Sequence, residues 1–131
     1  HGRFSSHSPL SSGLRLADGW LTVRDIYQMR LKADLVTLSG CDTGRSLIRA
    51  GDELYGFLRG FFAAGASSLI ASQWVANDEK SRDFMRSFYA GWYHLRHRVR
   101  RAAAIRESYR ASMDRSPHPT LWAPFILVGK P

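Results

Sequence analysis

The sequence has 131 residues, within the usual size of one domain, so we expect a single core. Apolar residues make up 44% and charged residues 23% of the chain, a balance that excludes the low hydrophobicity of disordered proteins. The formal net charge of +8 permits an acidic partner. The single cysteine, Cys41, excludes an internal disulfide and a zinc site built on paired cysteines. We therefore expect neither a metal nor a cofactor.

Two further expectations concern location. No apolar run approaches the roughly 18 residues needed to span a bilayer, so we expect no membrane insertion. The sequence also starts without the basic and apolar segments of a signal peptide. A lone thiol favours a reducing compartment, and the expected location is the cytoplasm.

The first half of the sequence predicts two strands around a helix. Residues 14–17 form the first candidate strand. Thr22, with Asp25 three positions later, is typical of a helix start, and this helix is expected to end near Lys32. Residues 35–38 form a short apolar run bounded by polar residues and glycine, which predicts a central parallel strand.

The second half continues the alternation of helices and strands. The third of its helices is expected to direct Ile105 and Tyr109 inward and its arginines, Arg101 among them, to solvent. Alternating strands and helices indicate an α/β domain with a largely parallel sheet. The predicted elements are a helix from Asp52 to a glycine cap at Gly65, a strand at 68–71, helices at 79–93 and about 97–113, and a last strand at 125–128.

Cys41 directly follows the predicted central strand. Ligands of open α/β sheets bind beyond the carboxyl ends of the strands, and Gly40 and Gly44 allow a sharp turn there. A nucleophilic thiol needs a proton acceptor, usually imidazole, and His1 lies 40 positions upstream. Caspases have their histidine before their cysteine at a similar spacing. The pattern favours a nucleophile, with a small buried thiol as the alternative.

Several blocks of the sequence resemble one family in its own order. The resemblance is to the CHAT domain, a bacterial relative of caspases and separases. The blocks are His1-Gly2, residues 16–22, residues 33–44, residues 51–54, residues 61–66, residues 71–74 and residues 122–129.

The resemblance implies a caspase-like fold with three α-β-α layers around a mainly parallel sheet. The family's domain begins with strands and helices upstream of the histidine. Residues 1–131 would therefore be a partial CHAT domain whose N-terminal part is missing. Parent proteins of the family often carry helical repeats that recruit partners.

The resemblance also implies an endopeptidase dyad. His1 matches the general base and Cys41 the nucleophile, and the backbone N–H groups of Gly2 and Cys41 match the oxyanion hole. The implied reaction is hydrolysis of a peptide bond in a protein substrate through a thioester.

Substrate recognition rests on fewer residues. Related separases bind a basic side chain through acidic residues after the strand that ends in tryptophan. Asp78 falls on one of these positions, whereas Val75 occupies the other. Trp74 and Asp42 are further candidates for the substrate pocket, although they also suit packing and turn roles.

Two other functions remain as alternatives. One is a CHAT-like interaction domain without catalysis. The other is a module that binds nucleic acid or an acidic protein through the arginine-rich helix between Arg96 and Arg115. Aromatic residues do not alternate with these charges, which disfavours nucleic acid.

Overall fold

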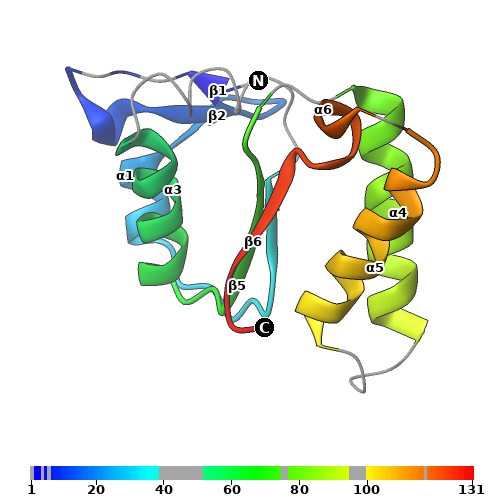
Figure 1. Cartoon of the computed structure of the whole chain (residues 1–131). Coiled ribbons are helices and arrows are strands. Elements are labelled where there is room, and N and C mark those ends of the chain that lie inside the picture. Colours follow the sequence, from blue (N-terminus) through cyan, green and yellow to red (C-terminus); the bar gives the residue numbers. More distant parts are fainter. Residues whose placement is uncertain are drawn as a thin grey trace.

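The computed structural model describes residues 2–3, 5, 7–38, 52–74, 77–94, 100–116 and 118–131, without the side chains of 52–55 and 94. Figure 1 shows the elements in space. In chain order they are β1 (Gly2–Arg3), η1 (Pro9–Ser11), β2 (Gly13–Arg15), β3 (Trp20–Thr22), α1 (Val23–Gln28), β4 (Val36–Leu38), α3 (Asp52–Ala63), β5 (Ser68–Ser72), α4 (Asp78–His94), α5 (Arg101–Met113), α6 (Pro119–Trp122) and β6 (Phe125–Gly129).

The described strands form two sheets, and the domain is mixed α/β as expected. The first sheet has the order β1-β2-β3 and is antiparallel, because short connections join consecutive strands. The second has the order β4-β5-β6, with β4 parallel and β6 antiparallel to β5. The described strands thus differ from the expected mainly parallel sheet. The chain enters β6 beside the carboxyl end of β5, where the Gln73 amide donates to the Pro124 carbonyl, so β6 must run back along β5.

Helices cover both faces of the second sheet, with α1 and α3 on one side and α4 and α5 on the other (Figure 1). All five residues of β5 are buried, which agrees with a strand covered on both faces. Leu69 and Ala71 pack into the cluster under α1 and α3. Ile70 packs into a second cluster with Phe84 and Phe88 of α4. Two aromatic residues of the predicted 79–93 helix, Phe84 and Phe88, are therefore part of the core.

Helix α1 confirms the predicted start and corrects the predicted end. The Thr22 hydroxyl accepts from the Asp25 amide at 3.2 Å, and the Asp25 carboxylate accepts from the Thr22 amide at 2.8 Å. The helix ends at Gln28, so the expectation of an end near Lys32 is wrong. The reason is tertiary: the Leu31 amide donates to the Ala64 carbonyl, which extends the chain along the end of α3.

Removing the cap is expected to weaken the domain. Thr22→Ala deprives the Asp25 amide of its acceptor, and loss of such a cap typically costs about 1 kcal/mol. Urea unfolding at neutral pH measures the difference. Thr22→Ser, which keeps the hydroxyl, is the matched control and should restore most of the loss. Equal destabilisation by both variants would contradict a capping role.

The same cap predicts that part of the stability of the domain is lost in acid. Hydrogen bonds from the Thr22 side chain and amide lower the pKa of Asp25 below its ordinary value. In this acidic range the unfolded state binds more protons than the folded state. The contribution of Asp25 to the free energy of unfolding is therefore complete above the unfolded pKa of about 3.9, and it is lost as the pH falls through the lower pKa of the folded state. Asp25→Asn should flatten the pH dependence of unfolding in that acidic window. An unchanged slope would exclude Asp25 as its source.

Helix α5 starts at Arg101, and residues 97–99 of the predicted helix lie outside the described residues. Ile105 is buried as expected, and the half-buried Tyr109 hydroxyl donates to the Phe125 carbonyl of β6. Burial raises the pKa of Tyr109, which keeps this donor protonated. The expectation for Arg101 is wrong, because its side chain turns inward and its Nη1 donates to Ser68 Oγ at 3.3 Å.

Candidate active site

The carboxyl ends of β4 and β5 lie together at one edge of the second sheet. These two strands are parallel, with Leu38 opposite Ala71, so both chains leave the sheet on the same side. This edge is at the top of Figure 1. The segment that leads to Cys41 starts there, because Leu38 ends β4 three positions earlier.

Strand β1 lies at the same end of the molecule as this edge (Figure 1). Gly2 is paired with Leu14 of β2, and Leu14 packs against the same hydrophobic cluster as Leu38. The antiparallel sheet and the end of β4 therefore pack against one hydrophobic cluster. The residue that follows His1 and the strand that precedes Cys41 share one supporting core.

The structure describes only part of the predicted site. His1, Cys41 and Asp42 lie outside the described residues, and so does Val75. Gly2 is described in β1, one of the two edge strands of its sheet. In an antiparallel pair the backbone groups of consecutive residues point alternately toward and away from the partner strand. One of the two residues of β1 therefore directs its N–H away from β2.

Trp74 lies just beyond β5 and is half-buried. Its indole Nε1 donates to the Thr120 carbonyl at 3.1 Å, which ties the end of β5 to α6. This bond fixes the orientation of the ring and gives Trp74 a structural role at the edge. The sequence could not indicate the bond, because its acceptor is a backbone group 46 positions away.

Asp78 is the first residue of α4 and is exposed. With Glu79 it places negative charge in the first turn of the helix, where the helix dipole favours it. Asp78 follows the end of β5 by six positions, so the start of α4 is connected to the same edge of the sheet as Trp74.

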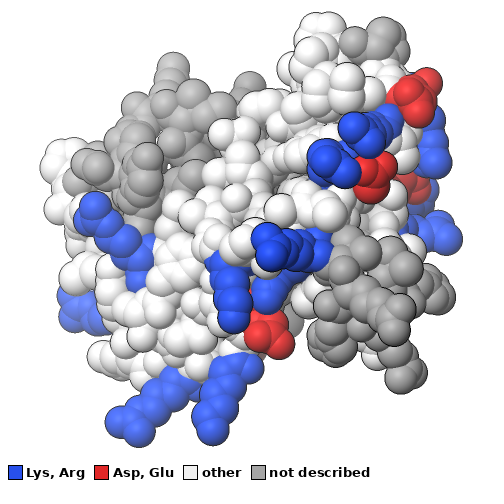
Figure 2. All heavy atoms as spheres, turned by 60° about the horizontal axis from the view of Figure 1, so that its bottom comes forward, with Lys and Arg blue, Asp and Glu red and all other residues white. Residues whose placement is uncertain are grey.

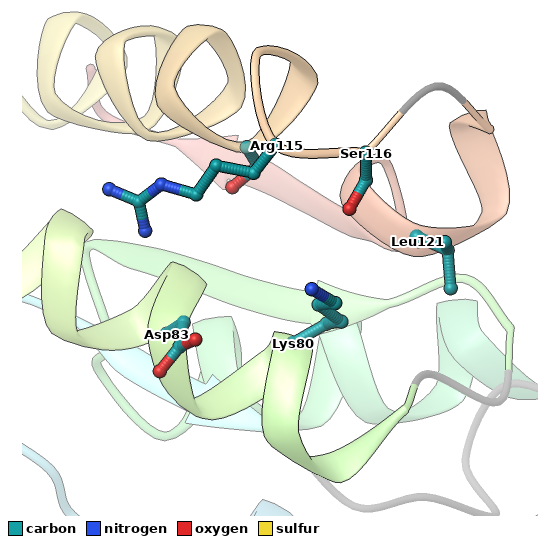
Figure 3. A pocket seen from close by; sticks show the side chains of 6 residues that line it. Lys80, Asp83, Arg115, Ser116 and Leu121 are labelled. Carbon is teal, nitrogen blue, oxygen red and sulfur yellow. The ribbon is translucent and has the colours of Figure 1, made fainter.

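A hollow lies between α4, the end of α5 and α6 (Figure 3). Lys80 and Asp83 line it from α4, and Arg115, Ser116 and Leu121 from the opposite wall. No local sequence pattern predicts this set of lining residues, because α4, the turn after α5 and α6 supply them from separate parts of the chain. Asp83 also pairs with Arg82 at 3.5 Å, so the lining carries mixed charge.

The described part of the arginine-rich segment does not form a continuous basic face. Arg106 and Arg110 both bond the Glu107 carboxylate at 3.2 Å, and Arg101 turns inward. Charge on this helix is thus partly neutralised. Within the described ranges, no cluster of His, Cys, Asp and Glu could hold a metal ion, and no helix is long and apolar enough to cross a membrane.

These features define an α/β domain whose candidate site is at the carboxyl edge of a small mixed sheet. The profile of the CHAT domain family matches residues 1–130. The chain therefore belongs to the CHAT domain family, which confirms the resemblance drawn from the sequence blocks.

A human relative is similar to most of the chain. Tetratricopeptide repeat protein 28 of Homo sapiens is 31% identical over 111 residues, which cover 83% of this chain. The match covers 4% of the relative, so this chain corresponds to a small part of a much longer protein. The resemblance implied a bacterial family, whereas this relative is human.

Proposed function

We propose that the domain is a cysteine endopeptidase in which His1 is the general base and Cys41 the nucleophile. The observation that carries the proposal is that β1 and the carboxyl ends of β4 and β5 lie at the same end of the molecule (Figure 1). Chain connectivity limits the reach of both residues. His1 is bonded to Gly2. Cys41 follows Leu38 by three residues, which span at most about 11 Å.

In this proposal the reaction is acyl transfer. The imidazole of His1 takes the thiol proton of Cys41, and the thiolate attacks the peptide carbonyl carbon. The C–N bond breaks as the imidazolium returns the proton to the leaving amine, which leaves a thioester on Cys41. A water molecule, deprotonated by His1, then hydrolyses the thioester and releases the acid and the thiol.

The oxyanion of each tetrahedral intermediate needs donors. The proposal assigns the backbone N–H groups of Gly2 and Cys41 to this role, each worth about 2.7 to 4 kcal/mol when aimed at the developing charge. The place of Gly2 in an edge strand supports this assignment, because such a strand leaves part of its backbone unpaired by its own sheet.

The complete domain is proposed to have the caspase-like three-layer fold. Helices on both faces of the second sheet support this architecture (Figure 1). The name of the human relative includes tetratricopeptide repeats, which supports helical repeats as partner domains in the parent protein. Such repeats would bring a protein substrate to the domain in the cytoplasm.

Labelling of the thiol tests the proposal. A fluorescent peptidyl acyloxymethyl ketone is expected to alkylate Cys41 of the folded parent protein and not that of the denatured protein. Activation by a neighbouring base makes a thiol reactive only in the folded site. His1→Ala should abolish labelling while the protein stays folded. Labelling that is equal in native, denatured and His1→Ala protein would exclude an activated nucleophile.

The proposal includes a preference for basic side chains through Asp78. Asp78→Ala is expected to lower cleavage after Arg or Lys by up to about fivefold relative to neutral residues, because an exposed carboxylate contributes up to about 1 kcal/mol to pairing. Glu79→Ala, next to it in the same first turn, is the matched control. A peptide library measures both profiles. If the Asp78→Ala profile matches the wild type, Asp78 does not belong to the substrate site.

A further inference from the structure

Five cationic side chains gather at the end of the second sheet that lies opposite the candidate active site. Four of them are exposed and Arg101 is half-buried. Figure 2 brings this end forward and shows Lys and Arg side chains over its lower part, with few acidic side chains among them. We call this cluster the basic end; its members are Arg30, Lys32, Arg100, Arg101 and Lys130.

Backbone hydrogen bonds between distant segments hold the basic end together. The Leu31 amide, between Arg30 and Lys32, donates to the Ala64 carbonyl at 2.6 Å. The Ser67 amide donates to the Ala33 carbonyl at 2.9 Å. The Lys130 amide in turn donates to the Ser67 carbonyl at 3.0 Å. The segments that carry three of the cations are therefore joined to one turn between α3 and β5.

Ser68 links the start of α5 to the segments that these hydrogen bonds join. Its hydroxyl donates to the Lys130 carbonyl at 2.7 Å and accepts from Arg101 Nη1 at 3.3 Å. The Arg101 guanidinium also lies 5.6 Å from the centre of the Trp92 ring. The Arg101 side chain is thus fixed in place, and its neighbour Arg100, the N-cap residue of α5, has an exposed side chain.

The charge of the basic end is poorly compensated among the described residues. None of its five cations has a carboxylate partner within 4.0 Å there, although Arg82, Arg106 and Arg110 elsewhere do. Arg101 Nε is buried and has no hydrogen-bond acceptor in the part that the structure describes. Asp34, which lies two positions after Lys32, is acidic. Placing like charges together is unfavourable unless an anion binds them.

We propose that the basic end binds an acidic segment of a partner polypeptide. The proposal concerns a recruitment surface and is independent of the peptidase chemistry. Because the basic end is opposite the carboxyl edge of β4 and β5, a bound segment would leave the candidate active site open (Figure 1). The acidic segment would pair with several cations at once, and a pre-positioned guanidinium such as that of Arg101 loses little entropy on pairing.

The arrangement favours polypeptide over nucleic acid. The cations converge around the end of three adjacent strands, each about 4.8 Å from the next, instead of following a track along the surface. A phosphate backbone carries a regular line of charge and would lie against Asp34. A polypeptide alternates charged with neutral residues and can place a neutral one there. Met29, next to Arg30, is 38% exposed and offers an apolar contact that suits such a residue.

Binding of a fluorescent ten-residue polyglutamate peptide to the folded protein tests the proposal. Wild type is expected to bind it in a salt-sensitive manner. The double variant Lys32→Glu/Lys130→Glu should weaken binding about tenfold or more, since both reversed charges belong to the contact. The matched control is Arg24→Glu/Arg86→Glu, which makes the same change in net charge on exposed side chains of α1 and α4. It should change the affinity about twofold or less.

Thermal unfolding of both double variants verifies that each is folded. Equal weakening by the two double variants would show an effect of net charge alone and overturn the proposal. So would an absence of peptide binding to the wild type. Tighter binding of a single-stranded oligonucleotide or of phosphatidylserine vesicles that is lost in Lys32→Glu/Lys130→Glu would overturn the assignment to a polypeptide.

Discussion

A Cys41→Ala variant of the full-length parent protein is expected to lose peptide cleavage by a factor on the order of 10⁴ or more. Without the sulfur no thioester forms, and only a slow reaction with water would remain. His1→Ala should cause a loss of similar size, because the two groups act as one unit and the thiol stays protonated without its base. Cleavage of a peptide library by the full-length protein measures both losses.

The dyad also predicts how the two changes combine. The double variant Cys41→Ala/His1→Ala should be no less active than Cys41→Ala alone, since removing one member already abolishes the function of the other. Arg59→Ala, at an exposed position of α3, is the control and should cleave like the wild type. Cleavage by Cys41→Ala at the wild-type rate would refute the peptidase proposal. It would leave the recruitment surface untouched, because peptide binding at the basic end is measured separately.

Gly65→Ala is expected to destabilise the domain by about 3 kcal/mol or more. Gly65 has a φ of +107°, a region that residues with a side chain rarely adopt. An added Cβ would lie 2.3 Å from the Leu31 carbonyl oxygen, a backbone atom that cannot rotate away. The Leu31 amide is bonded to Ala64, so relieving the clash would disrupt the contact between the end of α3 and the chain before β4.

A glycine inside α3, the helix that ends two residues before Gly65, gives the matched comparison. Gly56 lies inside α3, and an added Cβ there meets no atom of the described residues within 4 Å. Gly56→Ala should therefore stabilise the domain by up to about 1 kcal/mol, through the higher helix propensity of alanine. Denaturant unfolding of the two variants should give shifts of opposite sign. A Gly65→Ala shift near zero would mean that the turn can relax, and that its positive φ is not required.

Local features of the sequence predicted much of the secondary structure. The Thr22 and Asp25 pair begins a helix because both partners of the cap lie within one turn. Gly65 was expected to follow the helix from Asp52, and its positive φ agrees with that role. Phe84 and Phe88 are buried because their spacing defines one face of a helix. These predictions need only neighbours three or four positions away.

Predictions that depended on distant partners were less successful. The direction of β6 follows from a bond between Gln73 and Pro124, which no local pattern contains. Arg101 was expected to face solvent with the other arginines, yet Ser68 and Trp92 hold it inward. The candidate site was predicted through its order along the chain and through family resemblance. The structure adds that the elements next to His1 and Cys41 share one core.

Local patterns in the sequence predicted the longer helices and the strands of the second sheet, and the ordered blocks indicated the CHAT family. The pairing of the strands and the meeting of distant side chains depend on tertiary contacts that no local pattern contains. Lys32, Arg101 and Lys130 are far apart along the chain, and hydrogen bonds to the turn between α3 and β5 bring their segments together. The physical reason is that local conformation depends on adjacent residues. The position of a charged side chain in the folded protein depends instead on the hydrogen bonds that its segment makes to distant parts of the backbone.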